Sequence, residues 1–336
     1  MRAVVVLLQQ HAYRRAEFIH LVESVGYTIF YITWTNVRNI NPATYVGSGF
    51  IGYLQSLIES HKPDTVLFSD ALSARHTRNI QKALCLDIQD RTELILHIFK
   101  QRAQSFEGKL QVELADLNYM STKLVRGWTH LERQRGGIGL RGGPGETQIE
   151  VDRRILRDKI TNAKKKLKKL QKTRTLNRQS RLHNGVFNIA LVGYTNAGKS
   201  SLFNILTKST VDSVDKLFVT LDPKTRVIDT FSTKYLSVTI TDTVGFIEDL
   251  PGPLLEAFAS TLEEVAYADL LLHVVDAADK DKVFKMQTVQ TMIEKIGAEH
   301  VPLWTVHNKI DELNNDLSSH STLNDHWISA HNHLGI

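Results

Sequence analysis

The chain has 336 residues, of which 42% are hydrophobic and 23% charged, and this predicts a folded protein of two globular units with a connector. No stretch is long and apolar enough to span a membrane, and the apolar run in the opening MRAVVVLLQQH is too short for a signal peptide. A single cysteine, Cys85, excludes an internal disulfide, so we expect a cytoplasmic protein. The net charge is +5, and the positive residues gather in one segment, which favours a polyanionic partner.

Residues 1–105 alternate β-rich runs with helical patterns. The runs are AVVVLL, TIFYIT and DTVLFS, and the helical patterns cover residues 13–25, 50–60 and 74–84. This alternation predicts a small N-terminal α/β subdomain.

Residues 106–184 have the spacing of two helices packed against each other. Apolar side chains recur at steps of four and three, with Ser121 filling the one gap in the series, on both sides of a glycine-rich break, RGGIGLRGGPG, at residues 135–145. They are Leu110, Leu114, Leu117, Leu124, Trp128 and Leu131 before the break, and Leu156, Ile160, Ala163, Leu167 and Leu170 after it. We therefore expect an antiparallel αα-hairpin with a glycine-rich tip.

Residues 185–336 return to alternating strand and helix patterns, which predicts a doubly wound, mostly parallel sheet. Within this region the segment GYTNAGKS fits the P-loop pattern, directly after an apolar β-run and before a helical pattern. Glycines let successive backbone N–H groups converge on phosphate oxygens, Lys199 would neutralise the β- and γ-phosphates, and the Ser200 hydroxyl would hold Mg²⁺. The alternative is an ordinary turn between strand and helix. The predicted phosphate-binding residues are Gly193, Tyr194, Thr195, Asn196, Ala197, Gly198, Lys199 and Ser200.

The segment NKID at residues 308–311 follows the apolar run VPLWTV and predicts guanine specificity. The Asp311 carboxylate can accept from N1–H and the exocyclic amine of guanine, whereas adenine presents an acceptor at N1. The segment WISA at residues 327–330 would bring a backbone N–H to guanine O6; in isolation, NKxD could also be an exposed turn. The predicted base-binding residues are Asn308, Lys309, Ile310, Asp311, Ser329, Ala330 and His331.

Two further segments would complete the nucleotide site. Asp242, at the end of the strand YLSVTIT, could bind Mg²⁺ through water, and the Gly245 N–H could meet the γ-phosphate. In a switch segment before it, Thr220 is the candidate second hydroxyl ligand of Mg²⁺, with Thr225 as its rival. The nucleotide-binding residues predicted here are Phe218, Val219, Thr220, Leu221, Asp222, Asp242, Thr243, Val244 and Gly245, with Lys199, Thr220 and Gly245 as the catalytic set.

These motifs, together with others in the first half, resemble the HflX family of translational GTPases. The shared segments are NPATYVGSG (41–49), DRTELILHIFKQRA (90–103), LQVELADLNY (110–119) and GGIGLRGGPGETQIEVDRR (136–154). The resemblance implies a GTP-hydrolysing factor that binds the large ribosomal subunit and can separate ribosomal subunits under stress. It also implies a helix after the last guanine motif, which the region up to Ile336 lacks, and a lysine where His331 stands.

Phe246 follows DTVG, where Ras-like proteins carry the glutamine that orients the attacking water. This predicts slow intrinsic hydrolysis, with the missing stabilisation supplied by a partner or a bound cation. The Asn196 side-chain carbonyl could coordinate K⁺ beside the phosphates; alternatively, Asn196 only fixes the loop through a backbone hydrogen bond.

The second hairpin helix carries the concentrated positive charge, which predicts contact with ribosomal RNA unless it is simply a solvated face. The residues proposed for RNA binding are Lys164, Lys165, Lys168 and Lys169 on the helix and Arg135 and Arg141 in the glycine-rich tip, which could otherwise be an inert turn. The pattern GxGxxG at residues 137–142 follows a helix and not a strand, so we reject a dinucleotide site. The C-terminal histidines lack companions at metal-ligand spacing.

The sequence thus predicts a monomer that binds GTP, GDP and the large ribosomal subunit and that uses Mg²⁺, with K⁺ as a second candidate ion. Two other functions remain open: a nucleotide-driven RNA remodeller that uses the N-terminal half, and a slow signalling-type GTP-binding module.

Overall fold

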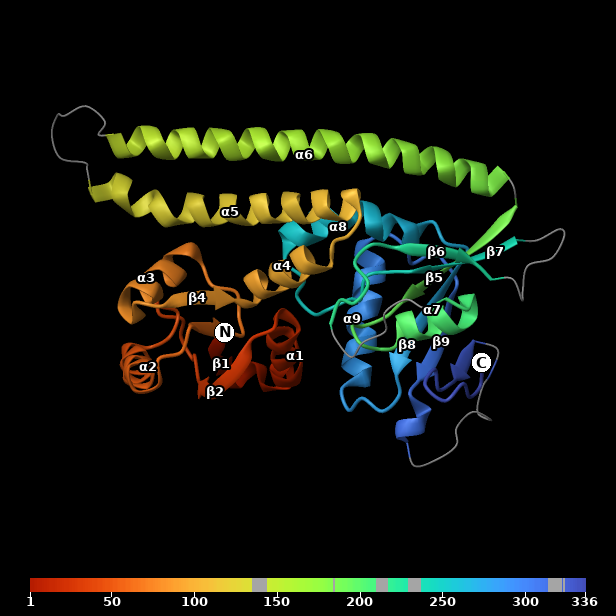
Figure 1. The fold of residues 1–336 in the computed structure, drawn as a ribbon, viewed down its shortest axis with the longest axis horizontal. Coiled ribbons are helices and arrows are strands. Elements are labelled where there is room, and N and C mark those ends of the chain that lie inside the picture. Colours follow the sequence, from red (N-terminus) through yellow and green to blue (C-terminus); the bar gives the residue numbers. More distant parts are fainter. Residues whose placement is uncertain (135–143, 184, 210–216, 229–236, 314–321, 323) are drawn as a thin grey trace. The chain divides into compact units, whose positions relative to one another are not determined.

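The structure is a computed structural model that describes residues 1–134, 144–183, 185–209, 217–228, 237–313, 322 and 324–336 (Figure 1). It contains two compact units. One comprises Met1–Gln101 with Glu113–Lys164, and the other comprises Arg102–Val112 with Lys165–Ile336. Both long helices of the hairpin therefore contribute residues to each unit. The predicted division at residues 105 and 184 stays a prediction.

The first unit is built on a four-stranded parallel sheet in the order β2-β1-β3-β4. Its strands are β1 (Arg2–Leu8), β2 (Thr28–Thr35), β3 (Thr65–Phe68) and β4 (Asp87–Asp90). The connecting helices are α1 (Arg15–Val25), α2 (Ser48–His61), α3 (Ala74–Leu84) and α4 (Arg91–Arg102), and a short 3₁₀ segment (Gln9–Arg14) precedes α1. The apolar run in β1 is buried on both faces, which is the pattern of a central parallel strand. Cys85 follows α3 with φ of 51°, and its side chain is exposed.

The hairpin is formed by α5 (Phe106–Gln134) and α6 (Pro144–His183), which run side by side (Figure 1). The glycine-rich break ends earlier than residue 145, because Pro144 already belongs to α6; proline has no N–H to lose at a helix start. The apolar seam is confirmed at Leu110, Leu114, Leu117 and Ala163, all of which are buried.

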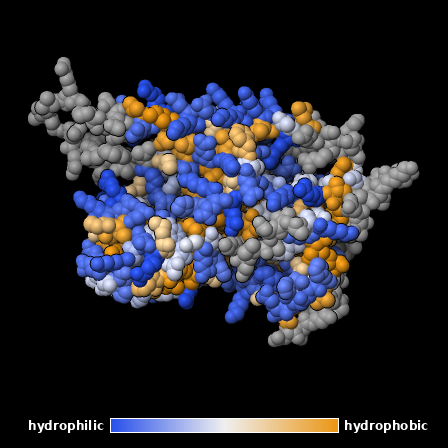
Figure 2. Space-filling model, viewed as in Figure 1, coloured by the Kyte–Doolittle hydropathy of each residue, from blue (hydrophilic) through white to orange (hydrophobic). Residues whose placement is uncertain are grey.

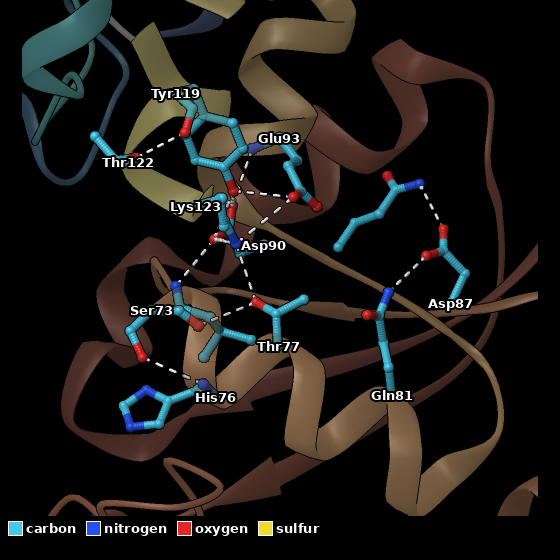
Figure 3. A network of polar contacts seen from close by, with 12 residues as sticks. Ser73, His76, Thr77, Gln81, Asp87, Asp90, Glu93, Tyr119, Thr122 and Lys123 are labelled. Atoms are coloured by element: carbon cyan, nitrogen blue, oxygen red, sulfur yellow. Dashed lines mark hydrogen bonds and ion pairs between the residues drawn. The ribbon is translucent and has the colours of Figure 1, made fainter. Parts of the chain in front are cut away.

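A buried polar cluster fastens α5 to the edge of the first sheet (Figure 3). Asp90, at the end of β4, is 1% exposed, and its carboxylate accepts hydrogen bonds from the main-chain N–H groups of Leu72 and Glu93, each at 3.0 Å. On α5, Lys123 Nζ lies 3.3 Å from Asp90 Oδ2, and the Tyr119 hydroxyl lies 2.9 Å from Glu93 Oε1 and 3.1 Å from Asp90 Oδ2. Burial raises the pKa of both Glu93 and Tyr119. The cluster thus caps α4 and docks α5 with the same carboxylate.

The second unit contains a six-stranded sheet in the order β10-β9-β8-β5-β7-β6, parallel except for the β6 and β7 pair. Its strands are β5 (Val186–Val192), β6 (Lys224–Val227), β7 (Ser237–Asp242), β8 (Leu270–Asp276), β9 (Leu303–Asn308) and β10 (Asp325–Trp327). Its helices are α7 (Lys199–Thr207), α8 (Gly252–Ala266) and α9 (Lys282–Lys295), with a 3₁₀ turn at Ile310–Glu312. The order reverses beside β5, so the switch point at which such sheets bind ligands lies at the carboxyl end of β5.

The predicted α/β class, the helical hairpin and the doubly wound sheet are confirmed. Among the described residues, none of the helices is both long and apolar enough to cross a membrane.

Candidate nucleotide site

The phosphate loop joins β5 to α7, and its glycines stand where a side chain has no room. Gly193 has φ of 154°, and a Cβ there would lie 2.3 Å from the Val274 carbonyl oxygen. Gly198 has φ of 91°, and a Cβ would lie 2.1 Å from Nδ2 of Asn308. These two positions require glycine both for conformation and for space, because neighbouring strands approach the loop closely.

Lys199 lies inside this loop and is 6% exposed. Its Nζ donates hydrogen bonds to the carbonyl oxygens of Tyr194 at 2.8 Å and Gly193 at 3.1 Å. Burial lowers the pKa of Lys199 to about 8, an effect that the negative charge of Asp242 partly opposes. Burial makes the charged form of this ammonium unfavourable. A phosphate bound beside it would therefore stabilise the charged form strongly.

Two hydroxyls and one carboxylate converge beside the loop. Ser200 Oγ and Thr220 Oγ1 each lie 2.7 Å from Asp242 Oδ2, and the two hydroxyl oxygens are 2.8 Å apart. Asp242 is fully buried, burial raises its pKa, and its Oδ1 has no hydrogen-bond partner among the described residues. An oxygen-only cluster with a buried carboxylate oxygen to spare fits the ligand preference of Mg²⁺. The rival hydroxyl, Thr225 Oγ1, instead lies 2.9 Å from Thr241 Oγ1 within the pair of strands β6 and β7.

The segment after β7 is fixed to the phosphate loop by main-chain hydrogen bonds. The Phe246 N–H donates to the Gly193 carbonyl at 3.0 Å, and the Thr195 N–H donates to the Phe246 carbonyl at 2.8 Å. A Cβ at Gly245 would lie 2.8 Å from Thr195 Cγ2 and 3.1 Å from Lys199 Nζ. The Phe246 residue is 3% exposed, so its ring is packed inside the protein and presents no polar group to the cavity.

The opposite end of the site is assembled from the ends of β9 and β10. The Asn308 side chain donates to the Ala197 carbonyl at 3.0 Å and accepts from the Ala330 N–H at 2.9 Å, which links the phosphate loop to the last loop. The Ser329 hydroxyl donates to Asp311 Oδ1 at 2.5 Å. Lys309 Nζ lies 2.6 Å from Asp276 Oδ2, at the end of β8. Ser329 thus occupies one Asp311 oxygen and Asn308 occupies the Ala330 N–H, which leaves Asp311 Oδ2, among the contacts of the described residues, to a bound base.

A cavity of about 690 Å³ joins the two ends. Its lining includes the following predicted nucleotide-binding residues: Thr195, Asn196, Gly198, Lys199, Ser200, Phe218, Val219, Thr220, Thr243, Gly245, Asn308, Lys309, Asp311, Ala330 and His331. Other predicted residues lie outside the lining: Gly193, Tyr194, Ala197, Leu221, Asp222, Asp242, Val244, Ile310 and Ser329. Several of these hold lining residues in place, as Ser329 holds Asp311 and Asp242 holds Thr220.

The sequence reasoning missed four residues of the lining and one supporting carboxylate. The lining residues are Ser201, Asn204, Ile205 and Glu312, and the carboxylate is Asp276. The helical pattern after Ser200 could have identified the first three, because residues one turn apart share a helix face. Asp276 carried a weaker signal, as an acid that ends the apolar run of β8.

The residues proposed for RNA binding divide into two groups. Lys164, Lys165, Lys168 and Lys169 are exposed on α6. Arg135 and Arg141 fall outside the described residues. The described part of the chain contains no group of three or more histidine, cysteine or acidic side chains that could hold a metal ion.

Comparisons with known proteins agree with this geometry. Sequence models of protein families match residues 12–100 as "GTP-binding GTPase N-terminal", 102–181 as "GTP-binding GTPase Middle Region" and 188–309 as "50S ribosome-binding GTPase". Curated relatives named GTPase HflX include those of Magnetococcus marinus, 48% identical over 88% of this chain and 68% of the relative, and Escherichia coli, 45% identical over 95% and 76%.

Solved structures are similar along nearly the whole chain. A complex of SsGBP with GDP is 25% identical with a TM-score of 0.57, covering 99% of this chain and 94% of that one. A GTP-binding protein from Sulfolobus solfataricus, also with GDP, is 24% identical with a TM-score of 0.53 and supports the fold alone.

Proposed function

Because the chain belongs to the HflX family of GTPases, we propose that it is a GTP-hydrolysing switch that acts on the large ribosomal subunit and separates ribosomal subunits under stress. The GTPase activity follows from the family and from the P-loop domain. The ribosomal partner is supported by the match of residues 188–309 to a ribosome-binding GTPase family and by the charge of α6.

We assign the nucleotide contacts to the cavity described above. The triphosphate would lie against the backbone of residues 193–200 and Lys199, and guanine against Asp311 and Ala330. Ser200, Thr220 and Asp242, the last through water, would hold Mg²⁺, which neutralises charge on the phosphates when bound. The Gly245 N–H would meet the γ-phosphate.

The hydrolysis step lacks a side chain that could orient water at position 246, because Phe246 is buried. Slow intrinsic turnover is therefore expected, and a cation near Asn196 could supply part of the missing stabilisation. Asn196 lines the cavity with φ of 63°, a conformation that asparagine tolerates, and this fits either K⁺ binding or a purely structural role in the loop.

Steady-state GTP hydrolysis in KCl and in NaCl at equal ionic strength separates the two roles of Asn196. We expect faster turnover in KCl, and Asn196→Ala should abolish the difference. Equal rates in the two salts would remove K⁺ from the proposal and leave the GTPase activity untouched.

The exposed lysines of α6 are the observation that carries the ribosomal part of the proposal. Figure 2 shows mostly hydrophilic residues along α6, interrupted by small hydrophobic areas. Lysines spaced this densely repel one another, and a partner rich in phosphate would relieve that repulsion while releasing its counterions.

Co-sedimentation with purified ribosomal subunits, with GDP and with a non-hydrolysable GTP analogue, tests the ribosomal part. We expect association with the large subunit that is stronger with the analogue. Absence of association under both conditions would leave a slow GTP-binding module that recruits proteins. ATP hydrolysis that survives Lys199→Ala would instead favour an RNA remodeller.

A further inference from the structure

Asp222 lies in the predicted switch segment, yet its carboxylate does not line the nucleotide cavity. It caps the start of α5 within the second unit. Asp222 Oδ2 accepts hydrogen bonds from the main-chain N–H groups of Gln104 at 3.0 Å and Ser105 at 2.8 Å. The Ser105 hydroxyl donates to Asp222 Oδ1 at 2.5 Å.

The start of α5 is built to receive this carboxylate. The Ser105 hydroxyl also accepts from the Gly108 N–H at 2.8 Å, so Ser105 caps its own helix while it binds Asp222. A Cβ at Gly108 would lie 2.0 Å from Asp222 Oδ1. Glycine in the first turn of a helix is unfavourable, and the close approach of Asp222 gives a reason for it here. The negative charge also lies at the positive end of the helix dipole.

The same short segment is held at its other end beside the phosphate loop. Thr220 Oγ1 donates to Asp242 Oδ2 at 2.7 Å, and Thr220 is 5% exposed. Only Leu221, 2% exposed, separates Thr220 from Asp222. Two residues span at most about 7 Å of extended chain. A displacement of Thr220 is therefore expected to displace Asp222, and the reverse.

The first turn of α5 is itself held by neighbouring helices of this unit. Glu107 Oε2 lies 3.0 Å from Nε of Arg174 on α6, and Gln171 on α6 donates to Glu263 Oε1 on α8 at 2.5 Å. The N-terminus of α5, to which Asp222 is hydrogen-bonded, is therefore held in place by other helices of the second unit.

From these contacts we infer that Asp222 is a positioning residue for GTP hydrolysis, which holds Thr220 in the place where it can meet Mg²⁺ by gripping the N-terminus of α5. The inference rests on the proposed role of Thr220. By the same linkage, the nucleotide state changes how firmly the first turn of α5 is held. The Asp222 carboxylate thereby links the N-terminus of α5 to the nucleotide site.

Two substitutions from opposite sides of the contact test the inference. Asp222→Ala removes the acceptor, and Gly108→Ala displaces the carboxylate while it improves the helix propensity of α5. We expect each to lower kcat about tenfold and to raise the Mg²⁺ concentration needed for half-maximal hydrolysis, while the affinity for GDP changes less than about twofold. The double variant should be no worse than Asp222→Ala, because the added methyl group then has no carboxylate to meet.

Asp269→Ala is the matched control, because Asp269 also accepts a main-chain N–H in this unit, that of Asn188 at 2.8 Å, but precedes β8 at the opposite end of the strands. This variant should keep the wild-type Mg²⁺ dependence. Asp222→Asn, which retains one acceptor oxygen, should lie between wild type and Asp222→Ala.

Amide hydrogen exchange provides a readout that does not need turnover. In the wild type, the amides of Gln104, Ser105 and Gly108 should exchange more slowly with a GTP analogue and Mg²⁺ than with GDP, and Asp222→Ala should remove the difference. Wild-type kcat and Mg²⁺ dependence in both Asp222→Ala and Gly108→Ala would overturn the inference and leave the proposed function standing. A wild-type protein that hydrolyses no GTP would refute the proposed function and the inference together.

Discussion

Lys199 shows how a single side chain prepares the site for an anion. Its ammonium contacts two carbonyl oxygens, but burial removes it from water and lowers its pKa to about 8. The phosphates of a bound guanine nucleotide add negative charge beside it and must raise that pKa again.

Nucleotide binding should therefore take up protons at alkaline pH. The free protein has Lys199 about half neutral near pH 8, and the bound form has it charged, so binding should take up about half a proton there and almost none near pH 6.5. Calorimetry of GDP binding in buffers of different ionisation enthalpy measures this number. Lys199→Arg, whose guanidinium stays charged, is the control and should show no uptake. Equal uptake by the two proteins would assign the proton to another group.

The residues that could be predicted best from the sequence are those whose role depends on near neighbours in the chain. The phosphate loop was predictable because its glycines, Lys199 and Ser200 act within eight residues of one another. The contact of Asp222 with the start of α5 was not predictable, because its partners Gln104 and Ser105 lie 118 and 117 positions away. Asp276 likewise becomes a partner of Lys309 only when β8 and β9 pair side by side.

At the scale of the elements, the cluster around Asp90 decides how α5 is fastened to the first sheet (Figure 3). The alternation of patterns predicted the sheet, yet β4 carries two acids among its four residues, DIQD, and offers no apolar run to identify. Strands of this kind become recognisable only through pairing, here the register of Thr65 to Phe68 with β4. The end of the glycine-rich break was likewise predicted too late in the sequence, because α6 already begins at Pro144 and proline can begin a helix.

Replacement of Asp90 should be costly. Asp90→Ala leaves two main-chain N–H groups without their acceptor and removes one anionic partner of the partly buried Lys123, so the free energy of unfolding of the first unit should fall by about 2–4 kcal/mol. Urea unfolding followed by circular dichroism measures the loss. Asp87→Ala, on the same strand but exposed, should cost less than about 0.5 kcal/mol. Equal losses for the two variants would show that the buried cluster around Asp90 adds no more to the stability of the first unit than an exposed side chain does.

For the molecule as a whole, a net charge of +5 matters less than its placement along α6. An evenly spread excess of this size would give weak attraction to any polyanion, whereas lysines on one helix can meet several phosphates at once.

Binding to the large subunit should accordingly weaken steeply as salt increases. Lys165→Glu with Lys168→Glu should reduce the affinity and should lower the slope of log affinity against log salt by about 1 to 2. Lys280→Glu with Lys295→Glu makes the same charge change at exposed positions near and within α9 and serves as the control. Filter binding or sedimentation over a salt series gives both slopes, and identical slopes for the two pairs would mean that α6 is simply solvated.

The exposed thiol at the end of α3 opens a route to motions of the whole molecule. Cys85 is the sole cysteine of the sequence, so a maleimide dye attaches at one known place in the first unit without prior mutagenesis. Energy transfer from that dye to a fluorescent guanine nucleotide in the second unit would then follow, in real time, whether hydrolysis changes the separation of the two halves.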